Sequence, residues 1–282
     1  MIQQTEIREK SSTWEVPPTT VEKDHALGHF LAAVTRHYNG QLLFKGGTCL
    51  RKCYFPEYRF SEDLDFSSVH STFQLTAGDL DIICQEAERH SGIRFRPEEI
   101  KSLLHKNIRK GDQVMIRFWG AYHPKHEEPS PVDRWHTKIK LEISTDELLS
   151  TLPEYKTIYH PYSDKVLTHD PMPCYTLDEV IAEKLRALVQ RKYTAPRDFF
   201  DLYHLTAQFT DVDWKRINPI FLSKMKHKDL GYSGPDSLVN PTSIQRALKA
   251  WNSSIDHQIN RTSSVQADDM INEVRSRILQ YL

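Results

Sequence analysis

Hydrophobic residues change their spacing partway along this chain of 282 residues. Before about residue 172, the stretches 112–122 and 136–145 alternate apolar and polar residues, as half-buried β-strands do. After Thr176 the apolar residues recur every three to four positions, which is typical of amphipathic helices. These helical segments are 176–192, 196–208, 212–227, 243–258 and 265–281. We therefore predict an α/β domain over residues 1–172, followed by an α-helical domain over residues 173–282.

Weaker sequence patterns predict the remaining elements of the first domain. We predict an irregular polar arm over 1–19, helices over 21–38 and 76–91, and a strand within RFSEDLDFSS. Proline and charge indicate a loop at 123–133. The proline-rich segment 153–173 is expected to link the two domains.

The charge of the chain is balanced overall but uneven along its length. Formal net charge is −1, so composition alone does not indicate a nucleic-acid partner. Residues 1–183 hold 22 Lys/Arg and 28 Asp/Glu, whereas residues 184–228 hold 10 and 4. An acidic part can hold divalent cations and a basic stretch can bind phosphates, although solvated helix faces explain the same asymmetry.

Several classes of protein and site are not expected. No window approaches 18 uninterrupted apolar residues, and the polar start lacks the apolar centre of a secretory signal, so we expect a cytoplasmic protein without a membrane partner. Zinc is not expected at the cysteines, which form no CxxC pair and should be reduced thiols. They are Cys49, Cys53, Cys84 and Cys174. His25 and His29 have the spacing of metal ligands, but the sequence offers no third ligand beside them.

The most informative polar residues are two aspartates within RFSEDLDFSS. On a strand, Asp63 and Asp65 point the same way, about 6–7 Å apart. Two carboxylates so placed can share Mg²⁺ ions that bridge nucleotide phosphates. If the strand 136–145 pairs beside them, Glu142 becomes a third carboxylate near the metal. A solvated strand edge is the simpler interpretation of each residue taken alone.

A glycine-containing turn, Lys45-Gly46-Gly47-Thr48, precedes these aspartates. Two glycines let the backbone approach a phosphate closely, and we expect Thr48 to cap the following helix. The N-terminus of that helix would then present free N–H groups to an anion. An ordinary helix-entry turn has the same pattern, and this one is no P-loop because the Gly-Lys-Ser/Thr ending is absent.

Taken in order, these elements are similar to the metal-site motifs of the polymerase-β-like nucleotidyltransferase fold. The stretch LLFKGGTCLRKCYFPEYRFSEDLDFS resembles the signature of the AbiEii family of nucleotidyltransferase toxins, which includes MenT-like toxins of type IV toxin–antitoxin and abortive-infection systems. The matching residues are Lys45, Gly46, Gly47, Thr48, Arg59, Ser61, Asp63, Asp65 and Phe66. A K-x-[DE] strand motif matches Lys140-Leu141-Glu142, and C-terminal motifs match TLDEVIAEKLRALVQR and RDFFDLYHL. The spacer of fourteen residues between Thr48 and Asp63 is long for nucleotidyltransferases at large.

The resemblance implies a fold and a set of roles. A mixed sheet with flanking helices would precede the helical domain. Asp63, Asp65 and Glu142 would bind Mg²⁺ or Mn²⁺. The NTP would be held by Lys45, Gly46, Gly47, Thr48, Lys140 and Lys184. The late catalytic aspartate falls on Asp198 or Asp201, between which the sequence does not choose. Lys184 lies beside Ile181 and Leu188 on an apolar stripe, where a buried ammonium needs a phosphate or a carboxylate partner.

The implied activity is metal-assisted transfer of a nucleoside monophosphate from an NTP to an acceptor hydroxyl. The chain would be a toxin of a toxin–antitoxin or phage-defence pair, with a cognate antitoxin as partner. For some relatives the acceptor is the tRNA 3′ end, so that translation is blocked. Alternatives are a transferase acting on a protein or small molecule, and a HEPN-like metal-independent ribonuclease using Arg197 and His204. Phosphorylation of Ser61 would add negative charge beside the metal site and inhibit it.

Overall fold

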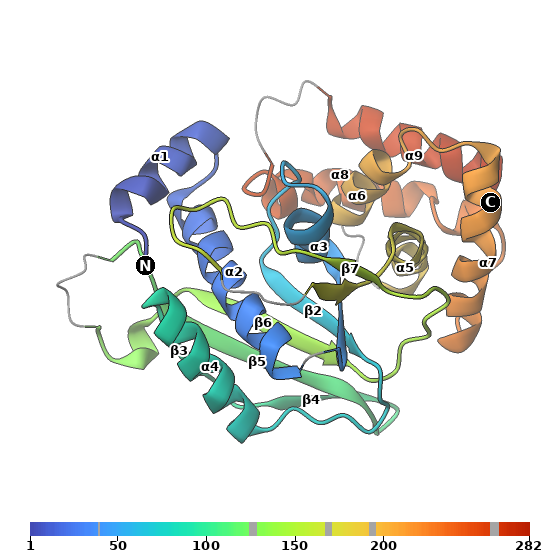
Figure 1. Cartoon of the computed structure of the whole chain (residues 1–282). Helices are drawn as coiled ribbons and strands as arrows, with labels where there is room; N and C mark the ends of the chain where they lie inside the picture. The colour runs from blue at the N-terminus through green and yellow to red at the C-terminus, as the bar shows by residue number, and fades with distance from the viewer. Residues whose placement is uncertain (39, 124–128, 167–170, 192–195, 260–264) are drawn as a thin grey trace. The chain divides into compact units, whose positions relative to one another are not determined.

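A computed structural model of the chain describes residues 1–38, 40–123, 129–166, 171–191, 196–259 and 265–282 (Figure 1). The chain divides into two compact units. The first consists of Met1–Asp146, Pro153–Cys174 and Gln258–Asn260. The second consists of Glu147–Leu152, Tyr175–His257 and Arg261–Leu282. Residues 124–128 of the loop predicted at 123–133 lie outside the described residues.

A single mixed sheet organises the described part of the first unit. Its eight strands are β1 (Leu42–Lys45), β2 (Asp63–Ser68), β3 (Arg94–Pro97), β4 (Lys101–His105), β5 (Ile108–Trp119), β6 (Lys138–Ser144), β7 (Glu154–Lys156) and β8 (Met172–Cys174). The order is β3-β5-β6-β2-β1-β8-β7, and β4 also pairs with β5. Strands β2 and β6 are parallel, as are β1 and β8, whereas the other neighbours are antiparallel. The alternation predicted for 136–145 is confirmed, because Ile139, Leu141 and Ile143 are buried.

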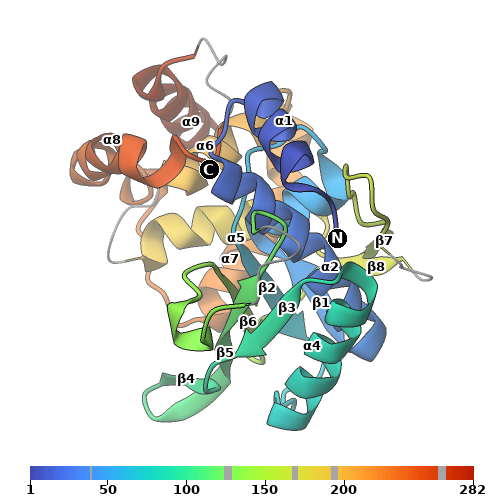
Figure 2. The ribbon, with the colours of Figure 1, turned by 90° about the vertical axis from the view of Figure 1, so that its left-hand side faces the viewer.

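The described residues of this unit also form helices. They are α1 (Gln4–Trp14), α2 (Pro18–Tyr38), α3 (Gly46–Cys49), which continues into a π-helical turn (Leu50–Tyr54), and α4 (Ala77–Ser91), with a short 3-10 turn at Val132–Arg134. Both views place α2 and α4 side by side against one face of the sheet (Figures 1 and 2). Phe30 of α2 and Ile83 of α4 belong to the same buried core as Leu64 and Phe66 of β2. Burying such side chains contributes about 1.5–3 kcal/mol each.

Two predictions for this unit are wrong. The segment 1–19 contains α1, whose Ile7 is fully buried in a cluster with Phe60 and Tyr162. Only Ile7 and Trp14 are apolar in that helix, so no stripe reveals it in the sequence. The proline-rich segment 153–173 is no simple linker, because β7 and the start of β8 pair with each other within it. Pro173 sits in β8 as the partner of Tyr155.

The second unit is helical, as predicted. Its helices are α5 (Leu177–Gln190), α6 (Pro196–Leu205), α7 (Asp211–His227), α8 (Pro241–Ile255) and α9 (Ala267–Tyr281), with a short 3-10 turn at Pro235–Ser237. Each predicted helical segment coincides with one of them within a few residues. Lys224 and Glu179 form a fully buried ion pair between α7 and α5, with Nζ and Oε1 2.5 Å apart. Within the described residues, no helix has the length and hydrophobicity needed to cross a membrane.

Candidate active site

The predicted carboxylates lie together on two neighbouring strands of the first unit. In the parallel pair of β2 and β6, Asp65 lies opposite Glu142 and Asp63 lies opposite Lys140. Adjacent strands are about 4.8 Å apart, so the three carboxylates share one patch of the sheet. The side chains of Asp63 and Glu142 are about a third exposed, at 31% and 34%, which leaves their oxygens accessible to a ligand. The prediction that the strand of Glu142 pairs beside that of Asp63 is confirmed.

Lys140 sits between the carboxylates. Its Nζ lies 3.4 Å from Asp63 Oδ2 and 3.4 Å from Glu142 Oε2. Burial works against the charged form of this lysine, but the carboxylates of Asp65, Asp63 and Glu142 outweigh it and raise the pKa of Lys140 above its ordinary value. The ammonium therefore stays charged and offsets part of the negative charge of the patch.

Asp65 is the perturbed member of the group. Burial raises the pKa of Asp65 to about 6, and the neighbouring charges of Asp63 and Glu142 add to this effect, while Lys140 and Lys45 oppose it. Lys45 is the direct cross-strand partner of Asp65 on β1. The raised pKa of Asp65 is therefore mainly an effect of burial, and a carboxyl group perturbed in this way within a carboxylate cluster is characteristic of functional sites.

The glycine turn packs directly against these carboxylates. Gly46 has a φ of +79°, and a Cβ at this position would lie 2.6 Å from Asp65 Oδ2. A Cβ at Gly47 would lie 2.8 Å from both Arg59 Nη2 and Ser61 Oγ. Only glycine combines that left-handed conformation with so close an approach. The turn therefore brings bare backbone to the edge of the acidic patch.

Thr48 has a different role from the predicted one. The residue that precedes α3 is Lys45, in an extended conformation, so Thr48 does not cap this helix. Its Oγ1 donates a hydrogen bond to the backbone carbonyl of Asp63. This hydrogen bond links the turn that carries Thr48 to the first residue of β2. Sequence spacing could not show this contact, because it joins residues on either side of the long spacer.

The predicted residues of the helical unit also gather. Lys184 Nζ of α5 lies 2.9 Å from Asp198 Oδ1 and 2.6 Å from Asp201 Oδ2, both on α6. The two aspartates are buried, and the Lys184 side chain is 13% exposed. Arg191 forms a further ion pair with Asp198. Both aspartates contact the lysine, so these contacts do not choose between Asp198 and Asp201.

The basic stretch 184–228 carries less available positive charge than its composition indicates. Many of its cations already face carboxylates of the same unit. They are Lys184, Arg186, Arg191, Arg216, Lys224 and Lys228. Lys192 lies outside the described residues. Paired charges contribute little to a phosphate-binding surface, so the net charge of this stretch is a weak indication of RNA binding.

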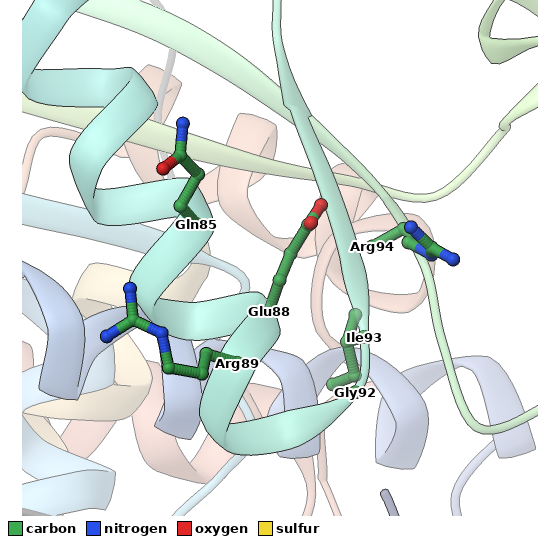
Figure 3. A pocket seen from close by; sticks show the side chains of 6 residues that line it. All are labelled: Gln85, Glu88, Arg89, Gly92, Ile93 and Arg94. Atoms are coloured by element: carbon green, nitrogen blue, oxygen red, sulfur yellow. The ribbon is translucent and has the colours of Figure 1, made fainter.

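Two further features were not predicted as parts of the site. Cys49, Cys53 and Cys174 are free thiols whose sulfurs lie within 4.8 Å of one another, a grouping that the sequence did not show because Cys174 is so distant along the chain. A surface pocket of about 460 Å³ lies where α4 ends and β3 begins, between Glu88 and Arg94 (Figure 3). The carboxylates of the acidic patch do not line this pocket.

Known proteins resemble this chain in fold and in sequence. A search of curated proteins gives no match. Among solved structures, the chain is similar to MenT4, a nucleotidyltransferase toxin from Mycobacterium tuberculosis H37Rv, with 19% identity and a TM-score of 0.65, over 100% of this chain and 91% of that one. A candidate nucleotidyltransferase from H. pylori matches with 17% identity and a TM-score of 0.51, over 90% of this chain and 95% of that one.

These structural likenesses establish the fold that the resemblance implied, a mixed sheet with flanking helices and a helical C-terminal part. The family assignment comes from the sequence itself. The family model for the AbiEii nucleotidyl transferase toxin of type IV toxin–antitoxin systems matches residues 29–274. That range holds the glycine turn, the acidic patch and the Lys184 cluster, so the chain belongs to the AbiEii nucleotidyltransferase toxin family.

Proposed function

We propose that this toxin transfers a nucleoside monophosphate from an NTP to an acceptor hydroxyl with the help of Mg²⁺ or Mn²⁺. The observation that carries the proposal is the row of carboxylates on β2 and β6 beside the glycine turn. Phosphoryl and nucleotidyl transfers need little covalent chemistry from the protein, because positioning and charge neutralisation supply most of the rate enhancement.

Asp63, Asp65 and Glu142 would hold the metal, since hard divalent cations prefer carboxylate oxygens. The geometry supports this fit, because Asp65 lies opposite Glu142 on the neighbouring strand and Asp63 is two residues away on the same strand. When bound, the ion would neutralise phosphate charge and stabilise the attacking and leaving oxygens of an in-line displacement.

The side chains and backbone of the toxin would position the substrate. Gly46 and Gly47 would admit a phosphate close to the backbone, with Lys45, Thr48 and Lys140 beside them. Lys184 of the helical unit would bind the triphosphate, and Asp198 and Asp201 would orient its ammonium, which they already contact. The acceptor hydroxyl then attacks the α-phosphate and pyrophosphate leaves.

For the acceptor we propose RNA, and specifically the 3′ end of tRNA, so that aminoacylation and translation stop. Family membership supports a cytoplasmic toxin that acts in phage defence and is paired with a cognate antitoxin. The same membership favours transfer over the HEPN-like alternative. Arg197 and His204 do lie on one helix, α6, but that arrangement leaves the acidic patch without a role.

Ser61 is a proposed point of inhibition. Its side chain is only 8% exposed and borders the position of Gly47, next to the acidic patch. A phosphate there would add negative charge beside Asp63 and Asp65 and weaken metal binding. Mass spectrometry of the toxin isolated with its antitoxin tests this point, and an unmodified Ser61 would remove it.

The decisive experiment incubates the toxin with Mg²⁺, each labelled NTP in turn and total RNA. Label on tRNA supports the proposal, label on protein or a small molecule supports the alternative acceptors, and shortened RNA without label supports a nuclease. Asp63→Asn and Asp65→Asn should abolish transfer. Glu98→Gln is the matched control, because Glu98 also pairs with a lysine of β6, Lys138, at 2.8 Å, yet lies outside the acidic patch. If Asp63→Asn transfers nucleotide at the wild-type rate, the metal assignment is wrong.

A further inference from the structure

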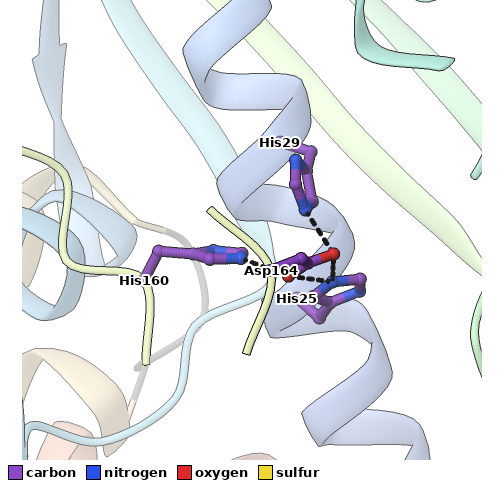
Figure 4. A group of neighbouring side chains, drawn as sticks. All are labelled: His25, His29, His160 and Asp164. Atoms are coloured by element: carbon purple, nitrogen blue, oxygen red, sulfur yellow. Dashed lines mark hydrogen bonds and ion pairs between the residues drawn. The ribbon is translucent and has the colours of Figure 1, made fainter. Parts of the chain in front are cut away.

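A second group of metal-capable side chains lies in the first unit, away from the acidic patch. His25 and His29 come from α2, and His160 and Asp164 come from the segment between β7 and β8 (Figure 4). The Asp164 carboxylate lies among the three rings, and each ring directs its Nε2 toward it. The missing third and fourth partners of the His25–His29 pair are thus about 130 residues further along the chain.

The distances within this cluster match a four-coordinate metal site. Nε2 of His25 lies 3.0 Å from Asp164 Oδ2, Nε2 of His29 lies 3.2 Å from the same oxygen, and Nε2 of His160 lies 3.1 Å from Oδ1. One donor atom from each residue falls within 4.8 Å of the others. In a tetrahedral zinc site with bonds of about 2.0–2.1 Å, neighbouring donors are about 3.3 Å apart. Small movements would therefore close the cluster around an ion.

The three rings are buried, and each directs one nitrogen to Asp164. The three Nδ1 atoms are buried and have no hydrogen-bond partner among the described residues. His25 and His29 are almost completely buried, and burial lowers the pKa of His25 and of His160, the latter to about 4. Neutral imidazoles and one ionised carboxylate are the protonation states that metal ligands require. The Met1 amino group lies 3.8 Å from Asp164 Oδ2.

The backbone of α2 is adapted to this cluster. Gly28 lies between the two histidines of the helix, and a Cβ there would overlap Nδ1 of His160. A glycine inside a helix costs about 1 kcal/mol relative to alanine, so its presence calls for a local reason. The reason here is the space that the His160 ring occupies against the helix. Nothing about the acidic patch requires this glycine.

We propose that His25, His29, His160 and Asp164 form a binding site for a divalent transition-metal ion. Imidazole donors favour zinc and its neighbours over Mg²⁺, and three nitrogens with one oxygen suit the tetrahedral preference of Zn²⁺. The four ligands would fill that geometry, which is typical of a structural rather than a catalytic ion.

Such an ion would join α2 to the segment that carries His160 and Asp164. Asp24, one residue before His25, accepts hydrogen bonds from Arg51, Lys52 and Tyr162, and so links the same helix and segment to the π-helical turn. That turn directly follows the glycine turn of the acidic patch. A bound metal would thereby stabilise the segments that support the proposed nucleotide site, and it would take no part in the transfer reaction.

The test measures metal content and metal affinity, which do not depend on transfer activity. The toxin is stripped with a chelator and titrated with Zn²⁺, and its metal content is measured by mass spectrometry. One tightly bound ion per chain is expected. Refilling with Co²⁺ should give the intense visible absorption of four-coordinate cobalt.

Three variants locate the ion. His29→Gln and Asp164→Asn should each weaken Zn²⁺ binding by at least roughly 100-fold, more than loss of an outer partner does. Gly28→Ala keeps every ligand but displaces His160, and it should weaken binding too. His37→Gln is the matched control, because His37 lies on the same helix and pairs with Asp79 at 2.8 Å outside the cluster. It should bind Zn²⁺ as the wild type does.

Two results would overturn the proposal. One is a wild-type chain that neither retains Zn²⁺ after purification from zinc-supplemented cells nor gains thermal stability when Zn²⁺ is added. The other is Zn²⁺ binding that survives His29→Gln and Asp164→Asn but is lost in Cys53→Ser, which would place the ion at the cysteine group. Should His29→Gln fail to fold, the Zn²⁺ titration of the wild type and of Gly28→Ala still decides.

Discussion

Replacing Asp65 by asparagine should make the metal-free toxin more stable while abolishing nucleotide transfer. In the folded chain, burial raises the pKa of Asp65 from 3.8 to about 6, which means that the fold disfavours its ionised form. The unfolded chain has no such preference. Above about pH 6 the wild type therefore carries a charge that opposes folding, and asparagine removes that charge while keeping the shape of the side chain.

The size of the effect follows from the shift. A rise in pKa from 3.8 to about 6 corresponds to a free energy of roughly 3 kcal/mol, and this is an upper limit because Asp65 is partly exposed. The sign is set by proton binding. The folded state holds this proton more tightly than the unfolded state, so the contribution of Asp65 to stability falls as pH rises from about 4 to about 6. The advantage of Asp65→Asn should thus be small near pH 4 and fully developed near pH 7.

Urea unfolding of both proteins across this pH range, without divalent ions, measures the difference. Asp63→Asn is the control, because Asp63 is a third exposed and pairs with Lys140, so its replacement should bring no gain. Saturating Mg²⁺ should stabilise the wild type, by about 2.7 kcal/mol at 100 times the dissociation constant, and leave Asp65→Asn unchanged. An Asp65→Asn protein that is no more stable than the wild type at neutral pH would refute this reasoning.

Further outcomes follow from the same structure. At subsaturating Mg²⁺, transfer should fall about tenfold per pH unit below about 6 as Asp65 gains a proton, and a pH–rate profile that is flat down to about pH 5 would contradict this. Gly46→Ala should lower the free energy of unfolding by about 1–2 kcal/mol and abolish transfer, since a side chain at φ +79° also overlaps Asp65; unfolding and transfer assays check both. Lys184→Met should lower the free energy of unfolding by about 3–5 kcal/mol, because it removes the ammonium that faces two buried aspartates, and adding Asp201→Asn should restore part of that loss in the same unfolding assay. Lys224→Met should lower the free energy of unfolding by a similar amount, because Glu179 would stay buried without the ammonium that it contacts. An unchanged unfolding midpoint would show that this buried ion pair does not contribute to stability.

The sequence predicted the parts of this molecule whose patterns are local. Alternation in β6 and over Asp63–Phe66 of β2 reflects burial of every second residue, and the helical period from α5 to α9 reflects one buried face per helix. The acidic patch was predictable because Asp63 and Asp65 are two residues apart on a strand. Its third carboxylate required one further assumption, the pairing of β2 with β6, which the register of Asp65 with Glu142 confirms.

What the sequence did not predict depends on contacts between distant residues. Strands β7 and β8 are three residues each, too short for alternation to be visible, and β8 contains a proline. Thr48 donates a hydrogen bond to the backbone carbonyl of Asp63. Because every residue has a backbone carbonyl, the sequence does not indicate which one accepts this bond. Likewise, His160 and Asp164 lie in an irregular segment that no periodicity orients toward α2. Tertiary packing determines each of these features.

The parallel pairing of β2 with β6 has a consequence for the order in which the acidic patch is assembled during synthesis. Residues 63 and 65 leave the ribosome long before residue 142, and the intervening strands β3 to β5 must be made before β6 can join β2. Non-local pairings of this kind form late in folding. A truncated product that ends before β6 therefore lacks Glu142 and Lys140. Synthesis itself therefore delays completion of the acidic patch.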